Sequence, residues 1–323
     1  MTEDRRHFVI FNPASGRGRG RRRIAGYRRL LEDALARVSF GTSPRPGGER
    51  ELANRAAGEG YDVVVAVGGD GTWSNVADGL LSSGRDDVAL GILPSGTGND
   101  FGRNLGYDPG DPAEAVRVLS AGRTRRVDVG HVDSLSASQH DPSALESRYF
   151  LNVIGFGFDV AVIVASAEAR FLKGALLYKV TALQQLFRFR GLDCSLVATD
   201  GRERNAHHLM LTISNARYFG GGFPIAPAAH VADGQLHACR IVDAPPFARF
   251  RLFNMAERGR HVRSERVEIL DADGFTLRFE EPPRFELDGD IRIAADRELR
   301  VRVLPAVLEV VAPVIDHSAT QST

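Results

Sequence analysis

The sequence predicts two domains: an N-terminal α/β domain built on a parallel sheet, and a C-terminal β-rich sandwich domain. Three observations lead to this fold class. The chain has 323 residues, more than a single domain usually needs. Its first 130 residues repeat a unit of strand, glycine loop and helix, and short alternating strands fill the chain from Tyr149 onward.

In the first part, apolar runs are typical of buried strands, and each run ends in a glycine-bearing loop. Apolar residues then recur at helical spacing from Ile24 to Val38, and another helix is expected over 112–120. Strands in such repeats form a parallel sheet covered by helices, and its ligands bind beyond the carboxyl ends of the strands. The expected strands are 7–12, 63–67 and 88–93, and the loops at that edge are 12–20, 68–72 and 94–102.

After Val132 the composition changes. The polar, proline-bearing segment 134–147 is typical of a surface loop, and the strands that follow indicate a mostly antiparallel sandwich or barrel. One helical stretch, roughly 165–190, interrupts them. The expected strands are RYFLNVIGF, DCSLVATD, HLMLTISN, QLHACRIV, VEILDADGFTLRFE, PRFELDG, LRVRVLP and VLEVVAP. We therefore expect domains at 1–132 and 133–313 and a frayed tail at 314–323.

Composition excludes several classes of function. Forty-one basic residues balance 41 acidic ones, so no overall field attracts nucleic acid. Cys194 and Cys239 stand alone, which argues against a zinc site or a disulfide framework and for a reducing compartment. No apolar run approaches about 18 residues and no signal-peptide core is present, so we expect a cytoplasmic protein, peripheral at most on the inner face of a membrane.

The commonest phosphate-transfer designs are also absent from the sequence. No G-x-x-x-x-G-K-[ST] motif occurs, which excludes an ordinary P-loop enzyme. No H-R-D or D-F-G occurs, which excludes a protein kinase of the usual kind. The glycine runs at 16–20 and 96–102 lack the full spacing of a dinucleotide fingerprint.

Six motifs, in order, resemble one family. They are NPASGRG (12–18), GGDGTWSNVADGL (68–80), LGILPSGTGNDFGRNLG (90–106), NVIGFGFD (152–159), SNARYFGGGFPIAPAAHVADGQL (214–236) and FELDGD (285–290). Together they resemble the diacylglycerol kinase catalytic-domain family, which includes bacterial soluble lipid kinases and sphingosine kinases, over about 7–313. The resemblance implies an NAD kinase-like α/β domain and an ATP- and Mg²⁺-dependent lipid kinase, with diacylglycerol as the first acceptor and a sphingoid base as the second.

The resemblance also implies a nucleotide site in the glycine loops. Main-chain amides can cradle phosphate oxygens and Thr72 can donate a hydroxyl, whereas Asp70 fits only if it faces Mg²⁺, a water or backbone. Alternatively, Asp70 fixes a tight turn, Thr42 lies in a surface turn, and Asn75 and Asn99 cap helices. The implied ATP contacts are Asn12, Pro13, Ser15, Gly16, Thr42, Gly68, Gly69, Asp70, Gly71, Thr72, Asn75, Gly96 and Thr97.

A second centre is expected at Asp288-Gly289-Asp290, where family members usually read D-G-E. Phosphoryl transfer to a hydroxyl needs a carboxylate near the attacking oxygen. By position Asp290 is the implied base, with Asp288 as a metal ligand or a rival base. The alternative is a hairpin turn between two strands. The resemblance further implies that the active site lies in a cleft between the domains.

A structural Mg²⁺ site is implied by the stretch HVADGQL, with the Asp233 carboxylate and the main-chain carbonyls of His230 and Gln235 as oxygen ligands. A plain hairpin turn at Asp233-Gly234 is the alternative.

The acceptor implied by the resemblance is a lipid, and the stretch 170–190 mixes apolar and basic residues without an acid. Such a helix can lie on an anionic bilayer, although a helix packed on its own sheet looks similar. We read the Arg17–Arg23 run as a solvated surface. Two rivals stay open, an NAD kinase and a catalytically silent lipid- or nucleotide-binding regulator. The oligomeric state, including a homodimer, is left open as well.

Overall fold

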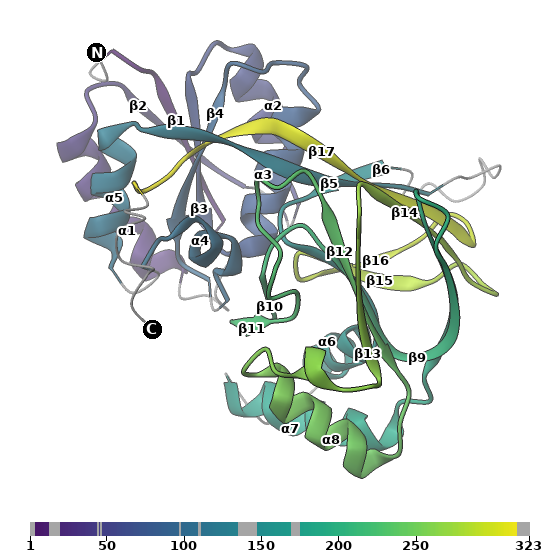
Figure 1. Ribbon diagram of the computed structural model, residues 1–323. Coiled ribbons are helices and arrows are strands. Elements are labelled where there is room, and N and C mark those ends of the chain that lie inside the picture. Colours follow the sequence, from purple (N-terminus) through teal and green to yellow (C-terminus); the bar gives the residue numbers. More distant parts are fainter. Residues whose placement is uncertain are drawn as a thin grey trace. The chain divides into compact units, whose positions relative to one another are not determined.

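The computed structural model describes residues 4–12, 20–43, 45, 47–96, 98–108, 111–134, 147–168 and 175–314. The described residues form two compact units, shown in Figure 1. The first unit comes from Met1–Val127 and Ala306–Thr323, and the second from Asp128–Pro305. Among the described residues, no helix is long and apolar enough to cross a membrane.

The first unit contains a parallel sheet in the strand order β2-β1-β3-β4. The end of β17 adds a further parallel strand, where Val310 pairs with Leu90. Every residue of β3 and β4 is buried, as expected for apolar strands covered on both faces. The elements are β1 (His7–Phe11), α1 (Gly20–Ala34), β2 (Val38–Thr42), α2 (Glu49–Gly58), β3 (Val63–Gly68), α3 (Asp70–Leu81), β4 (Ala89–Pro94), α4 (Asp100–Leu105) and α5 (Pro112–Ala121).

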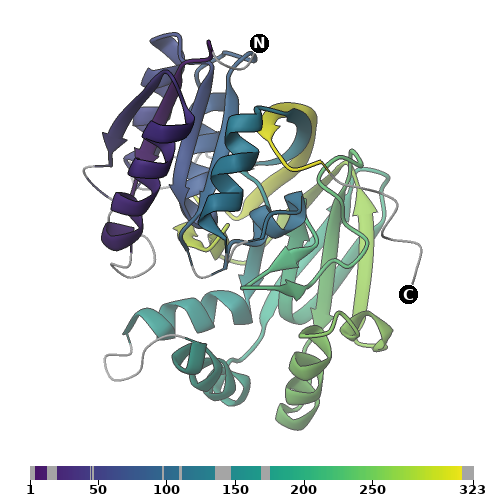
Figure 2. The same cartoon turned by 90° about the vertical axis from the view of Figure 1, so that its left-hand side faces the viewer.

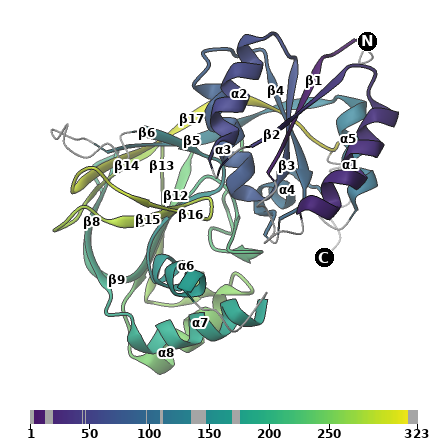
Figure 3. The ribbon, with the colours of Figure 1, turned by 180° about the vertical axis from the view of Figure 1, so that it is seen from behind.

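Helices cover both faces of this sheet. Figures 1 and 3 show α1 and α5 together on one face and α2 and α3 together on the other. Three aromatic side chains hydrogen-bond to main-chain carbonyls of the strands. Nε1 of Trp73 donates to the carbonyl of Ala66 at 3.1 Å, and the hydroxyl of Tyr27 donates to the carbonyl of Pro94 at 2.8 Å. The hydroxyl of Tyr107 donates to the carbonyl of Val311 at 2.9 Å. The predicted α/β class with a parallel sheet is confirmed.

One strand of this unit was not expected. The sequence predicts helical spacing up to Val38, whereas α1 ends at Ala34 and β2 begins at Val38. This strand lies at the sheet edge and is only partly buried, so it lacks the continuous apolar run by which β3 and β4 are recognised.

The second unit is built from antiparallel strands in the order β16-β15-β7-β9-β8-β14-β17, and β12 and β13 extend from β9. Its strands are β5 (Thr124–Ser134, which begins in the first unit), β6 (Ser147–Phe150), β7 (Val153–Gly157), β8 (Leu192–Ala198), β9 (Glu203–Ser214), β10 (Tyr218–Phe219), β11 (Phe223–Pro224), β12 (Leu236–Val242), β13 (Val267–Ala272), β14 (Gly274–Arg278), β15 (Arg284–Leu287), β16 (Asp290–Ile293) and β17 (Glu298–Val311).

Two apolar clusters lie in this unit. Leu211 and Ile213 of β9 belong to the larger cluster between the strands, whereas Met210 belongs to a smaller cluster beneath the helices. Figures 1 and 2 show those helices gathered at one end of the strands. They are α6 (Phe158–Glu168), α7 (Ala175–Arg188) and α8 (Pro246–Ala256), with the short 3₁₀ turn η2 (His261–Arg263). The predicted β-rich sandwich is confirmed.

Two details differ from expectation. The single helical stretch at 165–190 is two helices in the described residues, and the first begins at Phe158. The expected strands LRVRVLP and VLEVVAP are one strand, β17, which continues through Pro305 and Ala306, where φ is +52°. The two compact units meet along the chain after Val127 and after Pro305. The domain bounds 1–132 and 133–313 remain predictions.

Candidate active site

The glycine loops that follow β3 and β4 meet through their backbones. The N–H groups of Ser95 and Gly96 donate to the carbonyl of Gly68 at 2.7 and 3.1 Å. A β-carbon added to Gly96 would lie 2.6 Å from the Cα of Gly69, and one added to Gly69 would lie 3.0 Å from the Cα of Gly96. Only glycine fits this approach, so the two loops present one surface made of main chain.

The end of β1 joins the same edge. Asn12 follows β1, and its Nδ2 donates to Oγ1 of the buried Thr72 at 3.3 Å. Thr72 occupies the space next to Gly68 that a side chain would otherwise fill. Three strands far apart in the sequence therefore end at one place, as expected for ligand sites of parallel sheets.

Asp70 spans the two loops. Its Oδ1 accepts the N–H of Phe101, the second residue of α4, at 2.9 Å. The carboxylate thus faces backbone, one of the three environments in which an acid fits a phosphate loop. Asp70 is also the first residue of α3, which follows Gly69 as its N-cap. The N-terminus of a helix presents main-chain N–H groups that suit an anion.

The remaining predicted nucleotide contacts lie in β2, in α3, at the start of α4 or outside the described residues. Thr42 is the exposed last residue of β2, in register with Phe11, and Asn75 is partly buried in α3. Gly71 lies in the first turn of α3. Asn99 stands at the start of α4 with φ +56°, but its Nδ2 donates to the carbonyl of Gly96 at 3.2 Å instead of capping the helix. Pro13, Ser15, Gly16 and Thr97 lie outside the described residues.

In the second unit, Asp288-Gly289 is the turn that joins β15 to β16. Both residues have positive φ, +48° and +92°, as in the tight turns of β-hairpins. The Asp288 side chain is buried and accepts three main-chain N–H groups, from Leu151 at 2.6 Å, Asn152 at 2.8 Å and Val153 at 3.0 Å. This carboxylate holds the segment between β6 and β7 in place.

Asp290 has a different environment. It is the first residue of β16, its side chain is 45% exposed, and its Oδ2 lies 3.2 Å from Nη2 of Arg292. An ion pair this exposed contributes little to stability. Of the two acids in the motif, Asp290 is the one that reaches solvent.

Two buried acids beside this turn were not assigned a role from the sequence. Glu286 of β15 accepts the N–H of Gly289 on Oε2 at 2.7 Å, and Asp159 of α6 lies close by. Burial raises the pKa of Asp159 to about 7. Burial, and then the neighbouring Asp159, raise the pKa of Glu286 well above its usual value. Asp159 ends the apolar stretch of NVIGFGFD, and that position was the signal available in the sequence, whereas Glu286 stands among the other acids of FELDGD.

The predicted Mg²⁺ ligands form a turn. The Asp233 carboxylate accepts the N–H groups of His230 at 3.0 Å and Gln235 at 2.9 Å, and Nε2 of His237 lies 3.2 Å away. The His230 carbonyl accepts the N–H groups of Ala232 and Asp233. These contacts match the turn alternative. No cluster of three or more His, Cys, Asp or Glu side chains suited to a metal occurs among the described residues, and the metal role of Asp233 stays a prediction.

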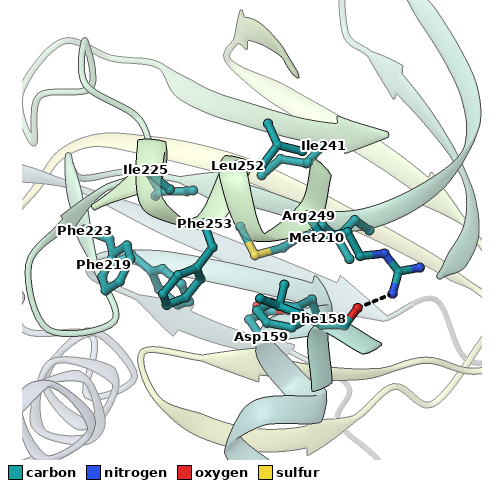
Figure 4. Close-up of a pocket in the computed structure, with 13 residues that line it drawn as sticks. Phe158, Asp159, Met210, Phe219, Phe223, Ile225, Ile241, Arg249, Leu252 and Phe253 are labelled. Atoms are coloured by element: carbon teal, nitrogen blue, oxygen red, sulfur yellow. Dashed lines mark hydrogen bonds between the residues drawn. The ribbon is translucent and has the colours of Figure 1, made fainter. Parts of the chain in front are cut away.

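An apolar pocket lies in the second unit, beneath α6, α7 and α8 (Figure 4). Its cavity volume is about 50 Å³, and the space around it opens to solvent. The lining residues are Phe158, Asp159, Leu186, Leu209, Met210, Phe219, Phe223, Ile225, Ile241, Arg249, Leu252, Phe253 and Ala256. The lining is apolar, and it is this character that suits the apolar part of a ligand.

Arg249 of α8 links this helix to α7 by hydrogen bonds beside the pocket. All three of its nitrogens donate: to the carboxylate of Asp243 and the carbonyl of Ala244, and to the carbonyls of Leu186 and Phe189 at 2.8 Å each. The bond to Leu186 is the dashed line in Figure 4. The guanidinium therefore completes the last turn of α7 and fixes one wall of the pocket.

Two family models match the chain. The model of the diacylglycerol kinase catalytic domain matches residues 6–132, and that of the YegS C-terminal NAD kinase beta sandwich-like domain matches residues 152–312.

Curated relatives and a solved structure that resemble this chain are also named diacylglycerol kinases. A Mycobacterium tuberculosis protein named diacylglycerol kinase is 30% identical over 96% of this chain and 97% of its own length. One of the same name from Bacillus subtilis is 26% identical over 87% of this chain and 88% of its own length. A crystal structure described as a diacylglycerol kinase from Bacillus anthracis superposes with a TM-score of 0.69 at 18% identity, covering 95% of this chain and 97% of that one.

Proposed function

Because the chain belongs to the diacylglycerol kinase family, we propose that it transfers the γ-phosphate of ATP to the hydroxyl of a lipid, with diacylglycerol as the first acceptor. The predicted enzyme class is thereby confirmed at the level of the family. The nucleotide, the metal ion and the acceptor are our proposals, and each rests on a separate feature.

The glycine loops support ATP as the phosphate donor. Gly68, Gly69 and Gly96 keep side chains away from the shared edge of β3 and β4, so phosphate oxygens can reach main-chain amides and the start of α3. Asp70, fixed by its bond to the Phe101 N–H, is the carboxylate at this edge that would hold Mg²⁺. When bound, the ion supplies positive charge that offsets the charge on the phosphate oxygens.

Asp290 is the candidate general base. Its side chain is 45% exposed, whereas the Asp288 side chain is buried and accepts three backbone N–H groups. A base must exchange a proton with a substrate hydroxyl, which requires access. We therefore assign proton abstraction to Asp290 and the positioning of its turn to Asp288.

The apolar pocket is the observation that carries the lipid assignment. Its lining is almost wholly hydrocarbon, which suits acyl chains better than the polar rings of NAD. The sandwich fold alone does not decide between a lipid and NAD as the acceptor, because the matching family model is described as NAD kinase-like.

The test is Mg²⁺-dependent transfer of labelled γ-phosphate from ATP to a panel of diacylglycerol, sphingoid base and NAD. We expect label on diacylglycerol. Label on NAD alone would overturn the lipid assignment, and label on no acceptor would favour a binding protein without catalysis.

An anionic bilayer is the proposed partner of the outer faces of α7 and α8. The side chains of Leu183, Phe187, Phe247 and Phe250 are 45%, 57%, 86% and 46% exposed. Neither helix has an acidic residue between its bounds, and Arg251 is exposed beside the two phenylalanines. Apolar residues with basic neighbours are typical of helices that lie on anionic membranes. Of the predicted 170–190 stretch, residues 170–174 lie outside the described residues.

These two helices face both the surface and the pocket. Leu186 of α7 and Leu252 of α8 line the pocket, while Phe187 and Phe250 on the same helices are exposed. A bilayer against the outer face would therefore lie one helix away from the apolar pocket, which is the arrangement a lipid acceptor requires.

The double substitution Phe247→Ser/Phe250→Ser is expected to weaken binding to phosphatidylglycerol-containing vesicles roughly tenfold or more, because two apolar rings no longer enter the interface. Vesicle sedimentation measures this. Val314→Ser, which changes an exposed apolar residue of the first unit, is the matched control and should bind normally. Equal binding by the double variant and the wild type would remove these helices from membrane contact.

A further inference from the structure

The link between helix α7 and strand β8 is built around the side chain of His207. Helix α7 ends at Arg188 and β8 begins at Leu192, so three residues join them. A β-carbon added to Gly191, the last of the three, would lie 2.1 Å from Nε2 of His207. Gly191 also has a φ of +85°, in the left-handed region that favours glycine. The link therefore leaves a space that the His207 ring fills.

Both nitrogens of the His207 ring face hydrogen-bond acceptors. Nδ1 lies 3.0 Å from Oδ1 of Asp193, the residue opposite His207 in the β8–β9 pair, and Nε2 lies 2.7 Å from the carbonyl oxygen of Arg190. A carboxylate and a carbonyl only accept hydrogen bonds, whereas a neutral imidazole has a single N–H to donate. Both contacts are therefore satisfied together by the doubly protonated, positively charged ring.

The groups that surround the ring favour the same charged form. The hydrogen bond with Asp193, and then the one with the Arg190 carbonyl, raise the pKa of His207 above its usual value, while burial acts in the opposite direction. The Asp243 carboxylate lies 3.7 Å from Nε2 and adds negative charge. Burial lowers the pKa of the adjacent His208 to about 4, so His208 adds no positive charge near pH 7.

A second cation holds the same end of α7. Arg249 of α8 pairs with the Asp243 carboxylate and donates to the carbonyls of Leu186 and Phe189. Asp243 therefore lies between Arg249 and the His207 ring. Because arginine stays charged in proteins, the part of this connection that responds to pH is His207.

We propose that His207 is a pH-sensitive latch on the C-terminal end of helix α7. When charged, the ring ties Arg190, in the link after the helix, to Asp193 of β8. When neutral, it lacks a donor on one side and that tie opens. Because the pKa of His207 is raised by folding, the latch stabilises the link fully below about pH 6.5 and loses this contribution as the pH rises through the pKa of the folded protein.

The latch also bears on the surface proposed to contact a bilayer. Leu186 of α7 lines the apolar pocket, and Phe187 of the same helix is exposed. An anionic membrane surface at about −30 mV attracts protons and lowers the local pH by about half a unit. The end of α7 is then held more firmly at the membrane than in solution. This consequence rests on the proposed membrane contact, whereas the latch itself does not.

The direct test is an NMR titration of the histidines in the full chain. The Cε1–H resonance of His207, assigned by its absence in His207→Gln, should titrate with a midpoint above about 6.5. Asp193→Asn should lower this midpoint, because its strongest acceptor loses the negative charge. Asp271→Asn is the matched control, since it removes an exposed carboxylate at the other end of the β12–β13 pair, opposite His237, and it should leave the midpoint unchanged.

Hydrogen exchange measures whether the charge holds the helix. The Phe189 N–H donates to the Gln185 carbonyl at 2.9 Å. Its protection factor in the wild type should fall at least about threefold between about pH 5.5 and about pH 8.5. His207→Gln does not titrate, so its protection factor should be the same at both pH values. Asp271→Asn should behave as the wild type.

Three results would overturn the latch: a midpoint at or below about 6.5, a midpoint that Asp193→Asn leaves unchanged, or wild-type protection of Phe189 that does not depend on pH. Persistence of that pH dependence in His207→Gln would overturn it as well, because another group would then be responsible. If His207→Gln does not fold, Asp193→Asn decides the question, since its midpoint and the pH at which protection falls should both be lower. Failure of the membrane contact is distinguishable, because it would abolish vesicle binding at every pH and leave the titration and exchange results intact.

Discussion

Asp290→Asn is expected to lower kcat for lipid phosphorylation by about 10²–10⁴-fold, the usual contribution of a general base. The substitution keeps the size of the side chain and removes its basicity. Because the Asp290 side chain is 45% exposed and its ion pair with Arg292 is weak, the fold should be little affected. KM for ATP should change by less than about threefold, since the proposed loss occurs in the transition state.

Two matched variants make this result specific. Asp290→Glu restores a carboxylate one methylene longer, as in the D-G-E of most family members, and should retain much more activity than Asp290→Asn. Asp288→Asn should instead lower the free energy of unfolding by about 1–3 kcal/mol, because an amide cannot accept all three backbone N–H groups. If Asp290→Asn loses ATP affinity as strongly as rate, a metal ligand is the better assignment. If it turns over normally, Asp290 belongs only to the hairpin.

Asp70→Asn is expected to lower kcat by at least about 10²-fold while the protein remains folded. The amide oxygen of Asn can still accept the N–H of Phe101, so the bridge from the glycine loop to α4 survives. The negative charge that would hold Mg²⁺ is lost. Calorimetric titration of Mg²⁺-ATP should therefore show weaker binding, and thermal unfolding should show little change.

Asp70→Ala is the companion variant. It loses the charge and the bridge together, so Tm should fall below that of Asp70→Asn by the equivalent of about 1–2 kcal/mol. Near-normal turnover of Asp70→Asn would mean that the aspartate serves only as a backbone acceptor. Equal Tm values for the two variants would mean that the bond to Phe101 adds nothing to stability.

The parts of the fold with strong local patterns were predictable from the sequence. The fully buried strands β3 and β4 are continuous apolar runs ending in glycine, and their meeting at one sheet edge follows from parallel pairing. The edge strand β2 was missed because its burial is partial, and β17 was divided because Pro305 and Ala306 look like a break in local sequence. Whether a segment such as β2 or β17 forms a strand depends on its pairing with distant strands, and a local sequence pattern carries no information on that pairing.

The candidate site was predictable in its positions but not in its interactions. The motif D-G-D contains two acids that the sequence alone does not distinguish. In the structure their environments differ, because Asp288 is buried and accepts three main-chain N–H groups, whereas Asp290 reaches solvent. Asp70 fitted either a metal or backbone, and its bond to Phe101 depends on a residue in the next loop. Asp159 and Glu286 were overlooked because their significance lies in their burial beside each other, a property that appears only after folding.

One measurement tests directly whether the phosphate acceptor is apolar. Wild-type protein is given Mg²⁺, labelled ATP and diacylglycerol in anionic vesicles, and the ADP released is counted against the labelled lipid formed. We expect one labelled phosphatidic acid for each ADP, with loss of both products in Asp290→Asn. Release of ADP without labelled lipid, or transfer of the label to NAD in preference to diacylglycerol, would contradict it.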